Sequence, residues 1–110
     1  MNIDEMPAGA EMDALMAEKV MGWPQENSVH WSPSRCLGAT WMVVTEITQN
    51  NGVSLRLVGP EYADDWTFSS GWHATFIESR YTFTDVGEGA TADTAPLAIC
   101  RAAYKFVEGQ

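Results

Sequence analysis

Basic residues are scarce in this 110-residue chain. Six lysines and arginines stand against fifteen aspartates and glutamates, which gives a formal net charge of -9 at pH 7. A surface of this sign repels the phosphate backbone of DNA and RNA, so we expect no general binding of nucleic acid. The acidic residues are scattered through the chain, which is typical of a solvated surface. Mimicry of DNA by such a surface is a less favoured alternative.

Cysteines are few, and long apolar runs are absent. Cys36 and Cys100 share no CxxC spacing and both have apolar neighbours, so the sequence predicts reduced thiols and no disulfide framework. No run approaches the ~20 apolar residues that a membrane span needs, and the amino terminus lacks the basic and apolar regions of a secretory signal. We therefore expect a cytosolic protein with no membrane partner.

The common motifs of catalysis and metal binding are absent as well. The chain contains no P-loop and no G-x-G-x-x-G, G-x-S-x-G or H-E-x-x-H motif. His30, His73 and Cys36 could together bind a transition metal, but no paired spacing supports this. Cys36 could also act as a nucleophile with either histidine as its base, yet nothing in the sequence brings these groups together. We predict no enzymatic activity, no cofactor and no metal.

Apolar residues are abundant, at 45% of the chain, and are sufficient for one packed core. Residues 1–9 have no periodicity and are predicted to form a flexible leader. Residues 10–108 are predicted to form a single domain, because no linker or internal repeat interrupts them.

Apolar residues at helical spacing predict two early helices. The first covers residues 10–21 and ends at Gly22. The second begins at the turn Ser32–Ser34 and ends at residues 50–52, although the β-branched residues 41–47 would also allow a strand. Its predicted apolar stripe consists of Leu37, Trp41, Val44 and Thr48, with Thr40, Val43 and Ile47 alongside.

Alternating apolar and polar residues predict three strands, at residues 53–58, 72–77 and 80–84. Residues 29–31 could add a short edge strand. The links between the three strands predict antiparallel pairing, and residues 86–89 are expected to lead directly to the last helix.

The last helix has the clearest signals. Asp93 or Thr94 can cap it, Pro96 lies in its first turn, and Arg101 and Lys105 lie toward the negative end of its dipole. Its predicted inward stripe, which makes Cys100 a packing residue, consists of Leu97, Cys100, Ala103, Tyr104 and Val107.

The order of these elements predicts the α+β class, as a three-layer α/β/α sandwich around a small, mainly antiparallel sheet. Large side chains occur in both alternating sets of the strands, which favours helices on both faces of the sheet.

Four short motifs, taken in order, are similar to those of a known family. They are AEKVMGW at 17–23, WSPS at 31–34 followed by Trp41, WHATF at 72–76, and ADTAPLAICRAA at 92–103. On these motifs the chain resembles the phage ABA sandwich domain, a family of small proteins of phages and prophages. The resemblance implies an α/β/α sandwich in the cytoplasm of an infected bacterium and brings no catalytic residues. Arg35 departs from the small polar residue that is common there in the family.

The turn from Ser32 to Arg35 is the best anion site that the sequence offers. Amides at a helix start, the Ser34 hydroxyl and the Arg35 guanidinium could together hold a phosphate. Simple N-capping by Ser34, with Arg35 in solvent, is the more common arrangement. Other candidates for phosphate contacts, each with an ordinary solvated alternative, are Arg56, Arg80 and Arg101.

Tryptophan provides the candidate stacking surfaces. Trp23 and Trp66 lie in predicted connections and could stack on a base. Trp41 and Trp72 are predicted to be buried.

These features favour a non-enzymatic, phage-encoded binding protein that sequesters a small anionic ligand, such as a nucleotide immune signal of the host. The aromatic and methionine content predicts a homo-oligomer, with pockets between the copies. Two alternatives stay open: an acidic module that binds and modulates a host or phage protein, and a structural or assembly accessory of the phage. The sequence identifies neither the ligand nor the number of copies.

Overall fold

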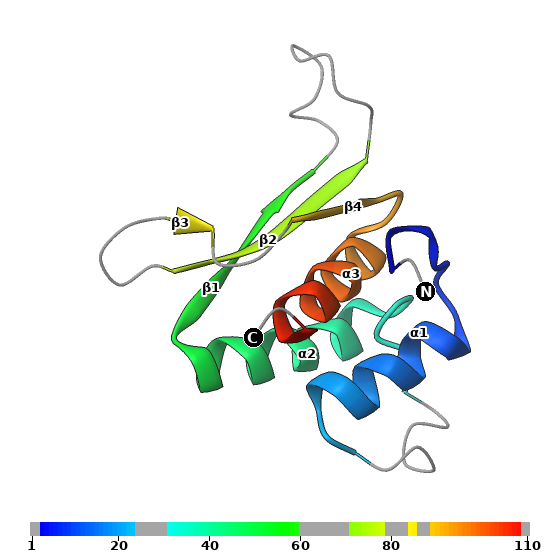
Figure 1. The fold of residues 1–110 in the computed structure, drawn as a ribbon. Coiled ribbons are helices and arrows are strands. Elements are labelled where there is room, and N and C mark those ends of the chain that lie inside the picture. The colour runs from blue at the N-terminus through cyan, green and yellow to red at the C-terminus, as the bar shows by residue number, and fades with distance from the viewer. Residues whose placement is uncertain (1–2, 24–30, 60–70, 79–83, 86–88, 109–110) are drawn as a thin grey trace.

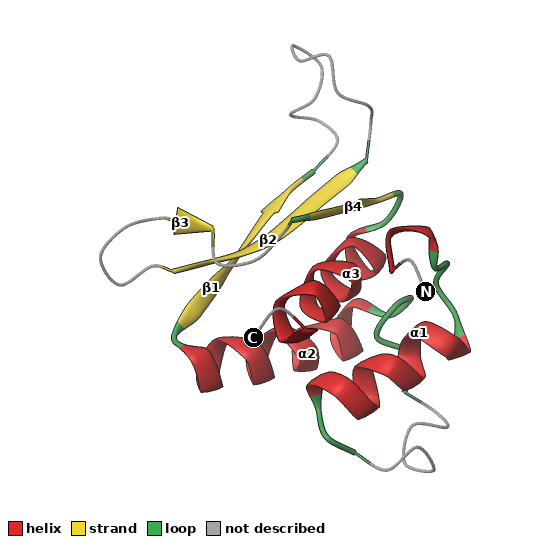
Figure 2. Cartoon of the chain, viewed as in Figure 1, coloured by secondary structure: helices red, strands yellow, loops and turns green. Residues whose placement is uncertain are grey.

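The computed structural model describes residues 3–23, 31–59, 71–78, 84–85 and 89–108. Figures 1 and 2 show an early helical block, a sheet and a closing helix. The elements are η1 (Ile3–Glu5), α1 (Ala10–Leu15), η2 (Met16–Val20), α2 (Leu37–Asn51), β1 (Val53–Val58), β2 (Trp72–Glu78), β3 (Thr84–Asp85), β4 (Ala90–Ala92) and α3 (Ala95–Glu108). The predicted class, α+β with an antiparallel sheet packed against helices, is confirmed. No helix in the described ranges is long and apolar enough to cross a membrane.

The sheet is built around β2. β1 pairs with one edge of β2, and β3 and β4 pair with the other edge, all antiparallel. The predicted strands at 53–58 and 72–77 are confirmed. Of the third, expected at 80–84, only Thr84 lies in the described ranges, and it begins β3. Trp31, the one described residue of the expected edge strand at 29–31, lies outside any strand.

The sequence did not predict β4. Its three residues pair with Trp72, His73 and Ala74, although residues 86–89 were expected to lead directly into the helix. Ala-Thr-Ala has weak strand propensity, so the strand depends on the edge of β2 that it joins.

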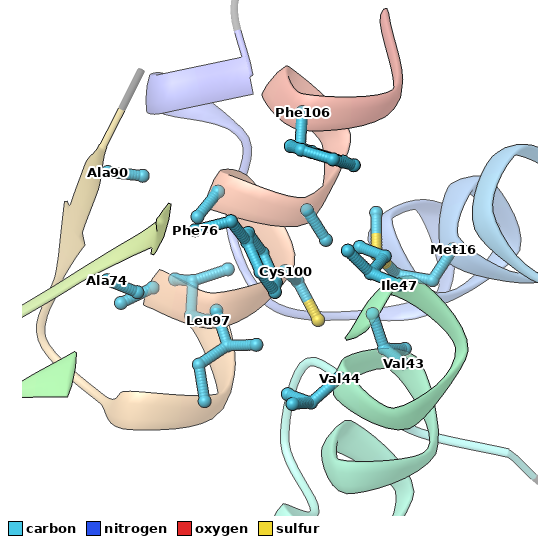
Figure 3. Packing of buried hydrophobic residues seen from close by; sticks show 14 of the residues in the cluster. Met16, Val43, Val44, Ile47, Ala74, Phe76, Ala90, Leu97, Cys100 and Phe106 are labelled. Atoms are coloured by element: carbon cyan, nitrogen blue, oxygen red, sulfur yellow. The ribbon is translucent and has the colours of Figure 1, made fainter. Parts of the chain in front are cut away.

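α3 is the central element of the fold. It packs against β2 and β4 of the sheet and also against η1, η2 and α2 (Figure 1). Figure 3 shows side chains from α2, η2, β2 and α3 meeting around Cys100, and the Phe76 and Phe106 rings lie 5.5 Å apart. Because α3 has neighbours on several sides, it buries more than the predicted stripe; its buried residues are Leu97, Ala98, Ile99, Cys100, Ala102, Ala103 and Phe106.

The start of α3 matches the prediction. The Thr94 hydroxyl accepts a hydrogen bond from the Leu97 amide at 3.4 Å, as an N-cap residue does. The packing role predicted for Cys100 is confirmed, because its side chain is buried in the core. Tyr104 and Val107 are only half-buried and pack at the margin of the core.

The predicted inward face of α2 was partly wrong, because its first two residues do not face the core. The residues that face the core are Thr40, Val43, Val44 and Ile47, at i, i+3, i+4 and i+7, which is the spacing of one helix face. Leu37 and Trp41 are instead exposed. The predicted end is correct, because Gly52 takes a left-handed conformation with φ 65°, which glycine adopts without strain.

The first helix continues from α1 into η2, a π-helical turn that the apolar pattern does not reveal. The Met21 amide donates to the Met16 carbonyl at 3.1 Å, five residues back. Gly22, at φ 71°, ends the helix as predicted. In the segment expected to be a flexible leader, Ile3 and Met6 lie in the core.

Candidate functional site

The turn before α2 holds a carboxylate that comes from the chain itself. Asp13 of α1 accepts two hydrogen bonds from Ser34 at its Oδ1, from the amide at 2.9 Å and from the hydroxyl at 2.7 Å. Nη2 of Arg35 lies 3.4 Å from Oδ2 of the same carboxylate. The groups proposed to hold a phosphate therefore bind an internal anion, and Asp13 is buried there.

Ser34 does not cap α2. Its hydroxyl binds Asp13 and accepts a hydrogen bond from the Gly9 amide at 3.0 Å. The N-cap residue of α2 is Cys36, whose side chain makes no capping bond. Thr40 instead bonds through its hydroxyl to the carbonyls of Pro33 and Cys36. Ser34 thus joins the start of α1 to the turn before α2, which is a structural role.

Arg101 is also bonded within the fold. Its Nη1 donates to the Thr91 carbonyl at 2.8 Å and its Nη2 to the Met6 carbonyl at 2.9 Å. Its Nε is buried and has no hydrogen-bond partner in the part of the chain that the structure describes. Lys105, one turn further along α3, lies 2.9 Å from the Asp4 carboxylate and donates to the Gly89 carbonyl at 3.1 Å. The polar face of α3 therefore holds the amino-terminal segment and the β4 region in place.

Trp23 stacks against another tryptophan. Its ring centroid lies 4.7 Å from that of Trp31, with the planes tilted by 55°. The Trp31 indole N–H donates to the sulfur of Met42 on α2 at 3.3 Å. The two other candidates, Trp66 and Arg80, lie outside the described residues.

The described helices lie on one side of the sheet (Figure 1), and Arg56 of β1 is on the other side. Val53, Leu55 and Leu57 of β1 contact the core, so the alternate side chains of the strands point to the other side. We call this surface the open face; its residues on β1 and β2 are Ser54, Arg56, Val58, His73, Thr75 and Ile77.

Arg56 and Thr75 are directly opposite each other on β1 and β2. The Arg56 side chain is exposed and makes no hydrogen bond or ion pair with the part of the chain that the structure describes. The Thr75 hydroxyl is buried and has no hydrogen-bond partner among the described residues. His73 lies two residues before Thr75 on the same face. As far as the described ranges go, the open face thus combines an unpaired guanidinium, an unsatisfied hydroxyl and an imidazole.

The two thiols differ sharply in environment. Cys36 is exposed and Cys100 is buried. Burial, and to a smaller degree the charge of Asp13, raises the pKa of the Cys100 thiol far above its usual range. No group of three His, Cys, Asp or Glu side chains suited to a metal occurs among the described residues, and His30 lies outside them.

The sequence did not identify three features of these surfaces. In the sequence Asp13 resembles any acidic residue near the start of a helix, and only the tertiary contact with Ser34 reveals its role. Thr75 resembles any polar residue of an alternating strand. The exposure of Leu37 and Met42 could have been inferred from the sequence. The face formed by Thr40, Val43, Val44 and Ile47 fits the i, i+3, i+4, i+7 spacing of a buried helix face better than the predicted stripe does.

Comparison with known proteins gives one match. The model of the phage ABA sandwich domain family matches residues 14–104, which is most of the chain. The resemblance found from the four motifs is thereby confirmed. Neither a curated protein nor a solved structure matches the chain.

Proposed function

Because the chain belongs to the phage ABA sandwich domain family, we propose that it is a phage-encoded binding protein that captures a small anionic ligand on the open face. The proposal includes the absence of a catalytic role and a location in the cytoplasm of the infected bacterium. The observation that carries it is that exposed Arg56 lies directly opposite the buried hydroxyl of Thr75, and that neither side chain has a polar partner among the described residues.

The chemistry of this pair suits a phosphate or carboxylate. Directly opposed residues in an antiparallel pair have Cβ atoms about 5 Å apart, so one anionic group can contact both side chains. The guanidinium can donate two parallel hydrogen bonds to such a group, and the hydroxyl can donate a third. Since the Thr75 hydroxyl is covered, the atoms that cover it must move to admit the ligand.

The state of three other basic groups supports the choice of Arg56. Arg35 and Lys105 already pair with carboxylates, and Arg101 already bonds to two carbonyls. A ligand would have to displace these internal partners, whereas Arg56 has none to lose in the described part of the chain. His73 adds an aromatic ring beside the pair, on which a base could stack.

The ligand class that we propose is a nucleotide, and its sequestration as a host immune signal would serve a phage. A binding role without catalysis fits this purpose because capture alone lowers the free concentration of a signal. One arginine supplies limited charge, so we expect a ligand with one or two phosphates.

The proposal is tested by thermal shift and titration calorimetry with cyclic dinucleotides, ADP-ribose derivatives and inorganic phosphate. A ligand at 100 times its Kd stabilises the protein by about 2.7 kcal/mol, which is well above the detection limit. We expect one nucleotide to bind and Arg56→Gln to weaken it at least tenfold.

Lys19→Gln is the matched control, because Lys19 is an exposed cation on a different surface and its removal changes the net charge equally. If both variants weaken binding to the same degree, the effect is one of overall charge and Arg56 is not the site. Flat responses of the folded wild-type protein to every ligand would contradict the capture function.

A further inference from the structure

The imidazole of His73 lies directly against the backbone of Gly89. A Cβ atom added to Gly89 would lie 2.6 Å from Nε2 and 2.8 Å from Cε1 of this ring. Both distances are far shorter than the 3.5 to 4.0 Å or so at which such atoms pack. The tip of the imidazole therefore occupies the space that a side chain at position 89 would need.

The ring is placed by packing alone, whereas the glycine is fixed by hydrogen bonding. His73 is half-buried and makes no hydrogen bond or ion pair with the described part of the chain. The Gly89 carbonyl accepts a hydrogen bond from Nζ of Lys105 at 3.1 Å, and Lys105 is paired with Asp4. A side chain added at position 89 would therefore displace the imidazole and leave the backbone in place.

This contact brings the imidazole level with Thr75. Gly89 precedes Ala90, the partner of Ala74, so it lies level with Thr75 on the edge of β2 that faces away from β1. Ala90 is buried in the core, and alternation places Gly89 on the open face. Arg56 lies opposite Thr75 on the other edge. The open face thus carries a guanidinium, a hydroxyl and the tip of an aromatic ring in a row across the strands.

We propose that Gly89 is a positioning residue, which sets the His73 imidazole to receive the base of a captured nucleotide. The proposal rests on the capture function above and extends it to the feature that distinguishes a nucleotide from a free phosphate. Neighbouring strands lie about 4.8 Å apart, so the row spans roughly 10 Å. A nucleotide can bridge this row with its phosphate between Arg56 and Thr75 and its base stacked on the imidazole.

Gly89→Ala is the informative variant. The φ angle of Gly89 is not positive, so alanine fits the backbone, and circular dichroism and the thermal midpoint should show a folded protein. The matched control is Gly38→Ala, because a Cβ atom there would meet only Sγ of Cys36, at 4.0 Å.

Nuclear magnetic resonance tests the position of the ring without a ligand. The chain has two histidines, so comparison with His73→Ala assigns the imidazole signals. We expect a nuclear Overhauser effect between Hε1 of His73 and the Hα protons of Gly89 in the wild type. Gly89→Ala should shift the His73 signals, and Gly38→Ala should not. An absent Overhauser effect, or unshifted signals in Gly89→Ala, would overturn the proposal.

Calorimetry tests the role of the ring in binding. The probes are the tightest-binding member of the cyclic dinucleotide and ADP-ribose screen, and inorganic phosphate. Gly89→Ala should weaken the nucleotide about tenfold, which is the scale of one stacking interaction, and should leave the affinity for phosphate unchanged. Gly38→Ala should change neither. Equal weakening of both probes by Gly89→Ala would mean that the anion site itself is disturbed, which would contradict the proposal.

A double-mutant cycle shows whether Gly89 acts through the ring. His73→Ala should also weaken the nucleotide about tenfold, and Gly89→Ala added to it should cost nothing more. Additive losses would overturn the positioning role.

The two proposals fail in different ways. If no nucleotide of the screen binds the wild-type protein, the capture function is wrong and the role of Gly89 falls with it. If a nucleotide binds and is weakened by Arg56→Gln but not by Gly89→Ala, capture stands and the positioning role is wrong.

Discussion

The Asp13 carboxylate accepts hydrogen bonds from both the amide and the hydroxyl of Ser34, a residue 21 positions further along the chain. This contact joins α1 to the turn that starts α2. It also fills the position where the sequence offered a phosphate site.

Replacement of Asp13 by alanine should destabilise the protein strongly. The buried amide and hydroxyl of Ser34 would lose their shared acceptor, and Arg35 would lose its nearest carboxylate. We expect a loss of about 3 kcal/mol in the free energy of unfolding, because buried donors left without partners are costly. Urea denaturation measures it.

Glu11→Ala is the control for that variant, since Glu11 is an exposed acid on the same helix. It should change the free energy of unfolding by less than about 0.5 kcal/mol. Equal effects of the two substitutions would mean that helix charge matters and the Ser34 contact does not.

Substitution of Thr75 by valine should stabilise the protein. Valine keeps the branched shape and removes a buried hydroxyl without a partner, so we expect a gain of about 1 kcal/mol. Thr40→Val is the counterpart, because the equally buried Thr40 hydroxyl bonds to two carbonyls. It should cost about 1 kcal/mol. Thermal unfolding of both variants distinguishes them, and a destabilised Thr75→Val would show that the hydroxyl has a partner in solution.

Removal of the Arg101 guanidinium should loosen the amino-terminal segment. Arg101→Met keeps the apolar stem but leaves the carbonyls of Thr91 and Met6 without their donor. We expect a loss of roughly 1 to 2 kcal/mol and faster amide hydrogen exchange in residues 3–9. Unchanged exchange in that segment would argue against its attachment through Arg101.

Stability should fall in alkaline solution through Cys100. Burial raises the pKa of this thiol in the folded protein, so the unfolded chain loses its proton first, near a pH of about 8.5. The folded state binds more protons above that pH, and its stability therefore decreases as pH rises.

The difference between wild type and Cys100→Ala isolates this effect. The free energy of unfolding of the wild type should fall more steeply than that of Cys100→Ala between about pH 8 and pH 10. Cys36→Ala, which changes the exposed thiol, should follow the wild type. Parallel curves for the wild type and Cys100→Ala would refute the assignment.

Features that depend on a short segment of the chain could be predicted from the sequence. The Thr94 cap and Gly52 and Gly22 as helix ends were predicted correctly, because each depends on the backbone preferences of a few neighbouring residues. The strands at 53–58 and 72–77 were predicted from alternation alone. In α2, by contrast, two overlapping apolar stripes compete, and the pattern favoured the wrong one.

The candidate sites were harder to predict because they depend on which groups meet in space. Ser34 and Arg35 were predicted to bind an anion because their side chains suit one. The sequence did not reveal that this anion would be the carboxylate of Asp13. The sequence likewise did not reveal whether Arg101 would bind a ligand or a group of the chain itself. In the structure it donates hydrogen bonds to the carbonyls of Thr91 and Met6. The Arg56–Thr75 pair exists only through the register of β1 and β2.

The sequence by itself determined the family, the α+β class, the acidic surface and the ends of most helices, because composition and short-range spacing specify these. The tertiary structure decided which side of α2 is buried, that β4 completes the sheet, and which basic groups are held internally. Those outcomes depend on contacts between residues far apart in the chain. Such contacts change the environment of a side chain, but they do not depend on the residues next to it in the sequence.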